Sequence, residues 1–219
     1  MNHLKSIFSL SETENNCITE LTQLIGKLNQ TGHSPATSGN YSVRLTTNPN
    51  YVLISESGLE KEFFTEKNLL PVDYRTASLH PDFEFKNKKI SDEAALHLKI
   101  YQNTKAQCVL HSHLLESIVC ADLSMNDFII FKNLEILKGL NGIKDHNTEI
   151  RVNIVNNSQN IQNLAEEIAP LILDSPIILI RGHGFYVWGD SFKQAKRHLE
   201  VFEYLFKYTI LTNTLRLNA

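Results

Sequence analysis

The segment Cys108-Val109-Leu110-His111-Ser112-His113 limits the possible folds of this chain more than any other feature. In it, an apolar run leads directly into two histidines that are separated by one residue. Side chains alternate between the two faces of a β-sheet, so His111 and His113 would share one face of a strand and Ser112 would lie on the other. The segment therefore predicts a buried strand whose two imidazoles can bind one metal ion. The alternative is two partly buried histidines that end a core strand.

A third histidine stands in a similar setting further along the chain. In Ile180-Arg181-Gly182-His183-Gly184, a second very apolar run ends in a histidine flanked by glycines. Three protein ligands with one open coordination position are the pattern of a catalytic zinc site. His111, His113 and His183 are therefore the predicted ligands of one Zn²⁺ ion per chain. Five further histidines are scattered and are expected at the surface: His3, His33, His80, His146 and His198.

Composition and charge narrow the class of protein. The 219 residues, 42% hydrophobic and 21% charged, can form one large domain, and no linker divides residues 1–219. A net charge of −3 without a basic stripe argues against a nucleic-acid partner. No secretory signal is recognisable, no apolar stretch reaches the roughly 18 residues that span a bilayer, and three cysteines without a Cys-x-x-Cys pair suggest reduced thiols. These features predict a cytoplasmic protein that does not enter a membrane.

Hydrophobic periodicity predicts strands interspersed with helices. Ser11 and Glu14 form a capping box for a helix that extends to about residue 28, and a hairpin is predicted over residues 41–54. The polar segment 81–89 is expected to form an exposed excursion. This order favours a layered α/β domain with a mixed sheet. Further strands are predicted at 108–113, 128–131, 150–155, 177–180 and 185–188, and further helix caps at Ser91, at Asn157 or Ser158, and at Asp190.

Two carboxylates are candidates for acid–base work, and three small-residue segments are candidates for anion binding. Glu93 opens a helix just before the His-x-His strand, and Glu135 lies in Asn133–Gly139, where it could equally be a solvated helix position. Glycine lets the backbone approach a phosphate, which free N–H groups and a helix dipole can hold. Ordinary turns use the same residues, so each segment alone is a weak signal. The three segments are Ser38-Gly39-Asn40, Ser57-Gly58 and Ser91.

Together these segments resemble the class II aldolase/adducin family, and the resemblance runs from about the first helix to the last. It is carried by the three anion segments, by Ser91-Asp92-Glu93, by His111-Ser112-His113 and by His183-Gly184. The resemblance implies a three-layer α/β/α fold with a central mixed, largely antiparallel sheet. It also implies zinc on the three histidines, homotetramers with sites near subunit interfaces, and a phosphate pocket formed by Ser38, Gly39, Asn40, Ser57, Gly58 and Ser91.

Within the family, Arg181–Gly189 resembles the His-Gly-x-Tyr-Val-Trp-Gly signature of the dehydratases of methionine salvage. This implies a hydro-lyase that acts on a methylthio-substituted ketose phosphate and needs no redox cofactor. The Glu-x-x-Lys-Gly setting of Glu135 matches the acid/base of those dehydratases, whereas Glu93 matches the acid of aldolases and is the second candidate. The alternatives are a sugar-phosphate aldolase or 4-epimerase with the same metal and phosphate sites, and a non-catalytic adducin-like interaction module.

Overall fold

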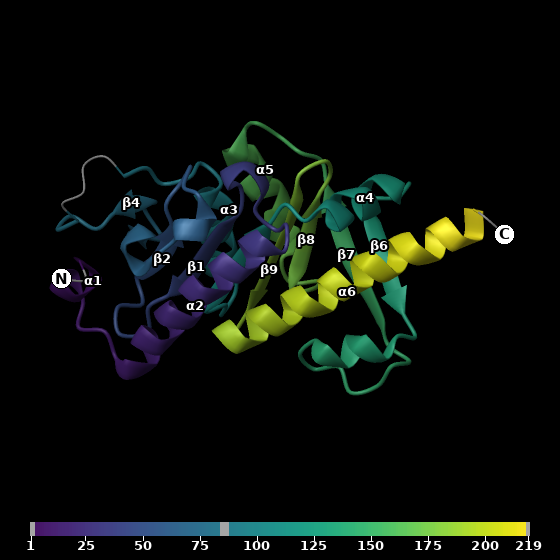
Figure 1. Cartoon of the computed structure of the whole chain (residues 1–219), viewed down its shortest axis with the longest axis horizontal. Helices are drawn as coiled ribbons and strands as arrows, with labels where there is room; N and C mark the ends of the chain where they lie inside the picture. Colours follow the sequence, from purple (N-terminus) through teal and green to yellow (C-terminus); the bar gives the residue numbers. More distant parts are fainter. Residues whose placement is uncertain (1–2, 84–87, 218–219) are drawn as a thin grey trace.

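A nine-stranded sheet runs through the computed structural model, which describes residues 3–83 and 88–217 (Figure 1). The strand order is β4-β3-β2-β1-β5-β9-β8-β7-β6. Among the described strands, β7 and β8 pair in parallel and every other neighbouring pair is antiparallel, so the prediction of a mixed, largely antiparallel sheet is confirmed. The strands are β1 (Asn40–Arg44), β2 (Tyr51–Ser55), β3 (Leu69–Asp73), β4 (Ser78–Leu79), β5 (Cys108–Ser112), β6 (Phe128–Lys132), β7 (Glu149–Val155), β8 (Ile177–Ile180) and β9 (Gly184–Gly189).

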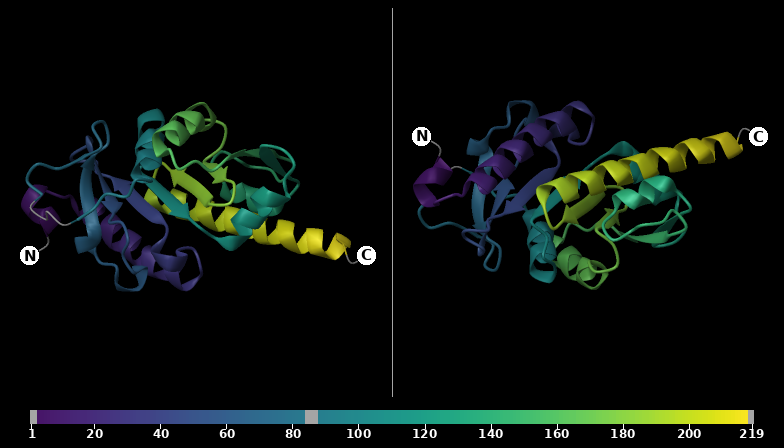
Figure 2. Two further views of the ribbon diagram at one scale, coloured as in Figure 1. Left: turned by 90° about the horizontal axis from the view of Figure 1, so that it is seen from above. Right: turned by 90° about the horizontal axis from the view of Figure 1, so that it is seen from below.

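Helices cover both faces of the sheet, which confirms the three-layer α/β/α arrangement. Figure 2 shows α2 and α6 on one face and α3 and α5 on the other, and α4 packs against α6. The α-helices are α1 (His3–Ile7), α2 (Glu12–Gln30), α3 (Ala94–Asn103), α4 (Leu115–Leu123), α5 (Ile161–Ile168) and α6 (Phe192–Leu217). Short 3₁₀ turns are η1 (Pro35–Thr37), η2 (Lys61–Phe63), η3 (Glu66–Asn68), η4 (Glu135–Gly139) and η5 (Ala169–Leu171).

The alternation of side chains along the central strands produces two separate cores. In β5, Cys108 and Leu110 join the core under α2 and α6, whereas Val109 joins the core under α3 and α5. By the same alternation, His111 faces the α3 side and Ser112 faces the α6 side. The predicted strand therefore presents its first histidine to one layer of helices and the following serine to the other.

The helix starts agree with the sequence at α2 and differ at α3 and α5. The capping box at Ser11 and Glu14 is present. However, α3 begins at Ala94 rather than at a cap on Ser91, and α5 is capped by Asn160 rather than by Asn157 or Ser158. In both places, a residue that precedes the helix contacts His183 instead, as described below.

Two further predictions need correction. The hydroxyl of Ser191, rather than Asp190, accepts a hydrogen bond from the first turn of α6. Phe83, in the segment expected to be exposed, is buried in the core under α3, whereas residues 84–87 lie outside the described part of the chain.

The three cysteines are free, as expected. Among the helices described, none combines the length and the apolar character needed to cross a membrane.

Candidate active site

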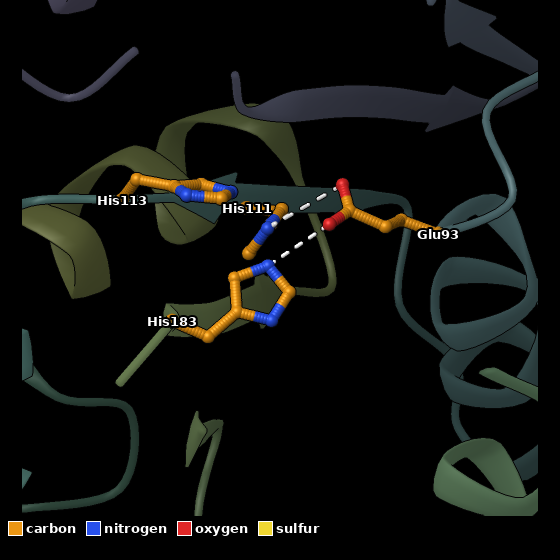
Figure 3. Close-up of side chains that lie close together, drawn as sticks. All are labelled: Glu93, His111, His113 and His183. Atoms are coloured by element: carbon orange, nitrogen blue, oxygen red, sulfur yellow. Dashed lines mark ion pairs between the residues drawn. The ribbon is translucent and has the colours of Figure 1, made fainter. Parts of the chain in front are cut away.

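Four side chains from distant parts of the chain converge at one end of the central strands (Figure 3). His111 lies in β5, His113 follows that strand, His183 lies in the turn between β8 and β9, and Glu93 immediately precedes α3. One nitrogen or oxygen atom of each lies within 4.8 Å of those of the others. The structure thus brings the three predicted ligands together and adds Glu93 to them.

A close approach of two backbone segments places His183 beside the His-x-His strand. β5 and β9 are antiparallel neighbours, and β9 begins at Gly184. Gly184 has a φ of 152°, and a Cβ at this position would collide with the carbonyl group of Ser112. The turn can therefore approach β5 only because glycine follows His183.

Hydrogen bonds orient two of the imidazoles. Nδ1 of His111 lies 2.9 Å from the carbonyl oxygen of Phe185, which can only accept, so Nδ1 carries the proton and Nε2 a free lone pair. Oδ1 of Asn157 lies 3.3 Å from Nδ1 of His183. Nε2 of His111 and Nε2 of His113 are buried without a hydrogen-bond partner among the described residues. Unpaired buried nitrogens are costly, and a bound cation would satisfy them.

The charge state of the cluster also suits a cation. Burial lowers the pKa of His111 well below its ordinary value, and burial together with His183 lowers the pKa of His113 to about 4. Burial alone would raise the pKa of Glu93, but its hydrogen bond with His183, 2.9 Å from Oε1, and the other imidazoles outweigh burial and lower it. A lowered pKa at His111, at His113 and at Glu93 favours the deprotonated forms, which are the forms that bind metals. Three imidazole nitrogens and one carboxylate oxygen form a donor set that fits Zn²⁺.

The segment Ser38-Gly39-Asn40 packs directly against this cluster. Nδ2 of Asn40 donates a hydrogen bond of 2.6 Å to Oε2 of Glu93. Gly39 has a φ of 79°, and a Cβ on it would lie 3.2 Å from the carbonyl oxygen of His111. The hydroxyl of Ser38 is buried without a partner among the described residues. The side chain of Asn40, part of a predicted phosphate segment, thus holds the carboxylate of Glu93.

A cavity of about 1080 Å³ opens beside the cluster, and His113, His183 and Glu93 line it. Ser57 and Ser91, two of the predicted phosphate ligands, also lie on its wall. Another part of the wall is the polar segment 157–162, which precedes and begins α5. The sequence did not reveal this contribution, because a run of amide and hydroxyl side chains before a helix looks like an ordinary cap.

The structure does not bring Glu135 to this cavity within one chain. The histidines lie where β5 and β8 end and where β9 begins. Because β7 is parallel to β8 and β6 is antiparallel to β7, β6 begins at this same end of the strands. Glu135 follows the far end of β6, and a strand of 5 residues is roughly 17 Å long. Its side chain is 71% exposed and pairs with Lys138 at 2.7 Å.

Two histidines expected at the surface, His33 and His198, are buried. Nδ1 of His33 lies 2.8 Å from the hydroxyl of Ser112, and the carbonyl oxygen of His33 accepts a hydrogen bond from the backbone N–H of His113. Its Nε2 lies 3.5 Å from Glu203 of α6. His33 thus supports the ligand-bearing strand from the opposite face of the sheet. Its position in a loop between helix and strand gave no sign of this.

Residues 19–210 match the family described as Class II Aldolase and Adducin N-terminal domain, and the chain belongs to this family. Several curated relatives carry the name methylthioribulose-1-phosphate dehydratase, and two of them illustrate the similarity. The protein from Pseudomonas fluorescens (strain Pf0-1) is 37% identical over 187 residues, which cover 84% of this chain and 86% of the relative. The protein from Geobacillus kaustophilus (strain HTA426) is 38% identical over 177 residues, which cover 80% and 82%.

Several solved structures share this fold. The L-fuculose-1-phosphate aldolase of Thermus thermophilus superposes with a TM-score of 0.72 at 21% identity, covering 92% of this chain and 97% of that one. An aldolase II superfamily protein from Pseudomonas syringae gives a TM-score of 0.76 at 18% identity, covering 94% and 79%. These likenesses support the fold alone.

Proposed function

We propose that the chain is a lyase that dehydrates 5-methylthioribulose 1-phosphate to 2,3-diketo-5-methylthiopentyl 1-phosphate in methionine salvage. One observation carries the proposal: a cluster of three imidazoles and a carboxylate lines a polar cavity in a chain that is 37–38% identical to dehydratases of that name. The phosphate of the substrate is assigned to the segments Ser38-Gly39-Asn40 and Ser57-Gly58 and to Ser91. Of these residues, Ser57 and Ser91 line the cavity.

Zinc is the proposed metal, with His111, His113 and His183 as ligands. A bound Zn²⁺ would act as a Lewis acid that polarises the C2 ketone of the substrate. Glu93, held by Asn40, adds a negative charge beside the imidazoles and faces the same cavity. The wall from 157 to 162 offers amide and hydroxyl groups that can bind the hydroxyls of a sugar chain.

The dehydration also requires a group that moves protons. The C4 hydroxyl is β to the ketone, so loss of a proton from C3 allows that hydroxyl to leave as water once it is protonated. We assign this acid–base work to Glu135, with Glu93 as the second candidate. Because Glu135 lies at the end of the strands opposite to the histidines, it would have to enter the cavity of another copy of the chain.

A homotetramer is the proposed assembly that places Glu135 there. The side chain of Glu135 is exposed in the single chain and hence available to a second copy. Part of α6 extends beyond the sheet (Figure 1). The second half of this helix carries exposed apolar side chains spaced along one helical stripe. These side chains are Tyr204, Tyr208, Leu211 and Leu215.

The test is a product assay on metal-analysed protein. Purified protein is loaded with Zn²⁺ and incubated with 5-methylthioribulose 1-phosphate, and the diketone is followed by NMR. Formation of the diketone with release of water supports the proposal, and an unchanged substrate in the presence of bound zinc contradicts it. The location of Glu93 in the cluster favours aldol cleavage as a second candidate function, so cleavage of L-fuculose 1-phosphate is measured in parallel.

A further inference from the structure

Lys61 is a buried lysine at the junction of two of the predicted phosphate segments. It begins η2, and only 1% of it is exposed. Its Nζ donates to the carbonyl oxygen of Thr37 at 3.0 Å and to that of Leu59 at 3.3 Å. Thr37 immediately precedes Ser38-Gly39, and Leu59 immediately follows Ser57-Gly58. One ammonium group therefore ties the two segments together.

The positive charge of Lys61 has no direct counter-charge. Among the residues that the structure describes, Lys61 forms no ion pair, and its two acceptors are neutral carbonyl groups. Burial lowers its pKa, while the more distant carboxylates of Glu60 and Glu93 act in the opposite direction. A buried charge is unfavourable unless it is paired, and an ammonium group has a third N–H to donate. An anion within reach of this N–H group would therefore stabilise the buried charge.

The surroundings of Lys61 suit an anion, and Ser57 of the second segment lies on the wall of the cavity. The backbone adopts positive φ at Thr37 (66°), Gly39 (79°) and Gly58 (72°), so both segments turn sharply where the ammonium group holds them. The hydroxyl of Ser38, next to Thr37, is buried and unpartnered among the described residues.

We propose that Lys61 provides the positive charge that balances the substrate phosphate, while it holds the two glycine segments in the shape that receives it. The inference rests on the proposed function, because it takes the substrate to be a phosphate ester. A phosphate ester carries between one and two negative charges near neutral pH, and lysine serves proteins as a point charge for phosphate. The predicted segments supply only hydroxyls, an amide and backbone N–H groups. Lys61 adds the cation that they lack.

Binding of inorganic phosphate tests the inference without any need for turnover. Lys61→Met keeps the length of the side chain and removes its charge, and Lys61→Arg keeps the charge. Lys67→Met, at an exposed position of neighbouring η3, is the matched control. The dissociation constant of phosphate, measured by calorimetry on zinc-loaded protein, should rise by about 10- to 100-fold for Lys61→Met. It should stay near the wild-type value for Lys67→Met, and Lys61→Arg should retain most of the affinity.

Kinetics separate a charge that binds phosphate from a residue that only stabilises the loops. For Lys61→Met, kcat/KM should fall for the phosphorylated substrate and remain close to the wild-type value for its dephosphorylated form. Equal losses on both substrates, or unchanged phosphate affinity, would overturn the inference. If Lys61→Met does not fold, the wild-type protein still decides: the ¹⁵N resonance of Lys61 Nζ should shift when phosphate is added, and that of Lys67 should not. A wild-type protein that binds phosphate through Lys61 but does not dehydrate the substrate would refute the proposed function alone.

Discussion

The side-chain amide of Asn40 donates a 2.6 Å hydrogen bond to Oε2 of Glu93, whose other oxygen lies 2.9 Å from Nε2 of His183. The first residue of β1 thereby fixes the carboxylate that faces the three imidazoles. Residues that orient a ligand group affect a metal site nearly as much as the ligands themselves. Asn40 is therefore assigned to the orientation of Glu93.

Asn40→Ala should weaken metal binding by about 10- to 100-fold, because the carboxylate of Glu93 is then free to rotate away from the cluster. Competition with a chromogenic zinc chelator measures the affinity. Asn103→Ala, at the exposed end of α3, is the control and should bind zinc as the wild type does. Wild-type zinc affinity in Asn40→Ala would show that Glu93 needs no such support.

His183→Ala should lose both bound metal and activity, because it removes one of the three imidazoles that meet in the cluster. Elemental analysis of the purified protein gives the metal content per chain. His146→Ala removes an exposed histidine that is not part of the cluster and should keep a full complement of metal. Stoichiometric metal in His183→Ala would exclude this residue as a ligand.

Glu135→Gln should lower kcat by roughly 10²- to 10⁴-fold, the usual contribution of one general acid/base, without loss of metal. Glu93→Gln should weaken metal binding but retain more turnover than Glu135→Gln once metal is saturating. Steady-state kinetics on the methylthio substrate with metal analysis compares the two. Collapse of turnover in Glu93→Gln alone would transfer the proton-moving role to Glu93 and favour the aldolase interpretation.

Mixed oligomers test whether Glu135 acts in the site of another copy. Glu135→Gln and His183→Ala proteins should each have little activity on their own. Sites in a co-expressed mixture can combine an intact Glu135 with an intact His183, so activity should return. A mixture of either single variant with the double variant is the control and should stay inactive. No recovery in mixed oligomers of confirmed composition would contradict a site shared between copies.

Glu14→Gln should lower the free energy of unfolding at pH 7 by about 1–3 kcal/mol. Oxygens of Glu14 accept hydrogen bonds from the backbone N–H groups of Ser11, Thr46 and Thr47. Although burial opposes ionisation, hydrogen bonds from the backbone and side chains of Thr47 and Ser11 lower the pKa of Glu14 from 4.5 to about 2. The stabilisation is therefore complete above pH 4.5 and disappears as the pH falls towards 2.

Denaturant titrations at several pH values measure this effect. The difference between wild type and Glu14→Gln should shrink steadily between pH 4.5 and 2. Glu20→Gln, on the exposed side of α2, is the control and should change stability by no more than about 0.5 kcal/mol. A difference that does not depend on pH would mean that the carboxylate charge of Glu14 is not what stabilises the fold.

The sequence was most informative about features that depend only on residues close to one another in the chain. Alternation along 108–113 predicted which side chains share a face of β5, and Ser11 with Glu14 marked the start of α2, because both depend only on neighbouring residues. The three histidines could be grouped because each follows an apolar run at a strand end, and the structure places those ends side by side.

Contacts between distant segments could not be predicted in this way. The neighbours of Asn40 in the sequence do not distinguish it from a turn asparagine, although its side chain donates a hydrogen bond to Glu93, 53 residues away. Lys61 follows a glutamate and precedes another, which suggests a solvated turn, yet it is buried. His33 was expected at the surface because its neighbours indicate a loop. In each case the decisive partner lies far away in the sequence, so only the folded chain reveals the role.

The convergence of Glu93, His111, His113 and His183 depends on the pairing of β5 with β9, strands that are far apart in the sequence. In the unfolded chain these four groups are scattered, so a metal that binds them together binds the native state preferentially. Metal then acts as a cross-link that resists unfolding of the central sheet. Protein starved of metal would open more often and be degraded sooner, so that metal supply would govern how much of this protein a cell retains as well as how fast it works.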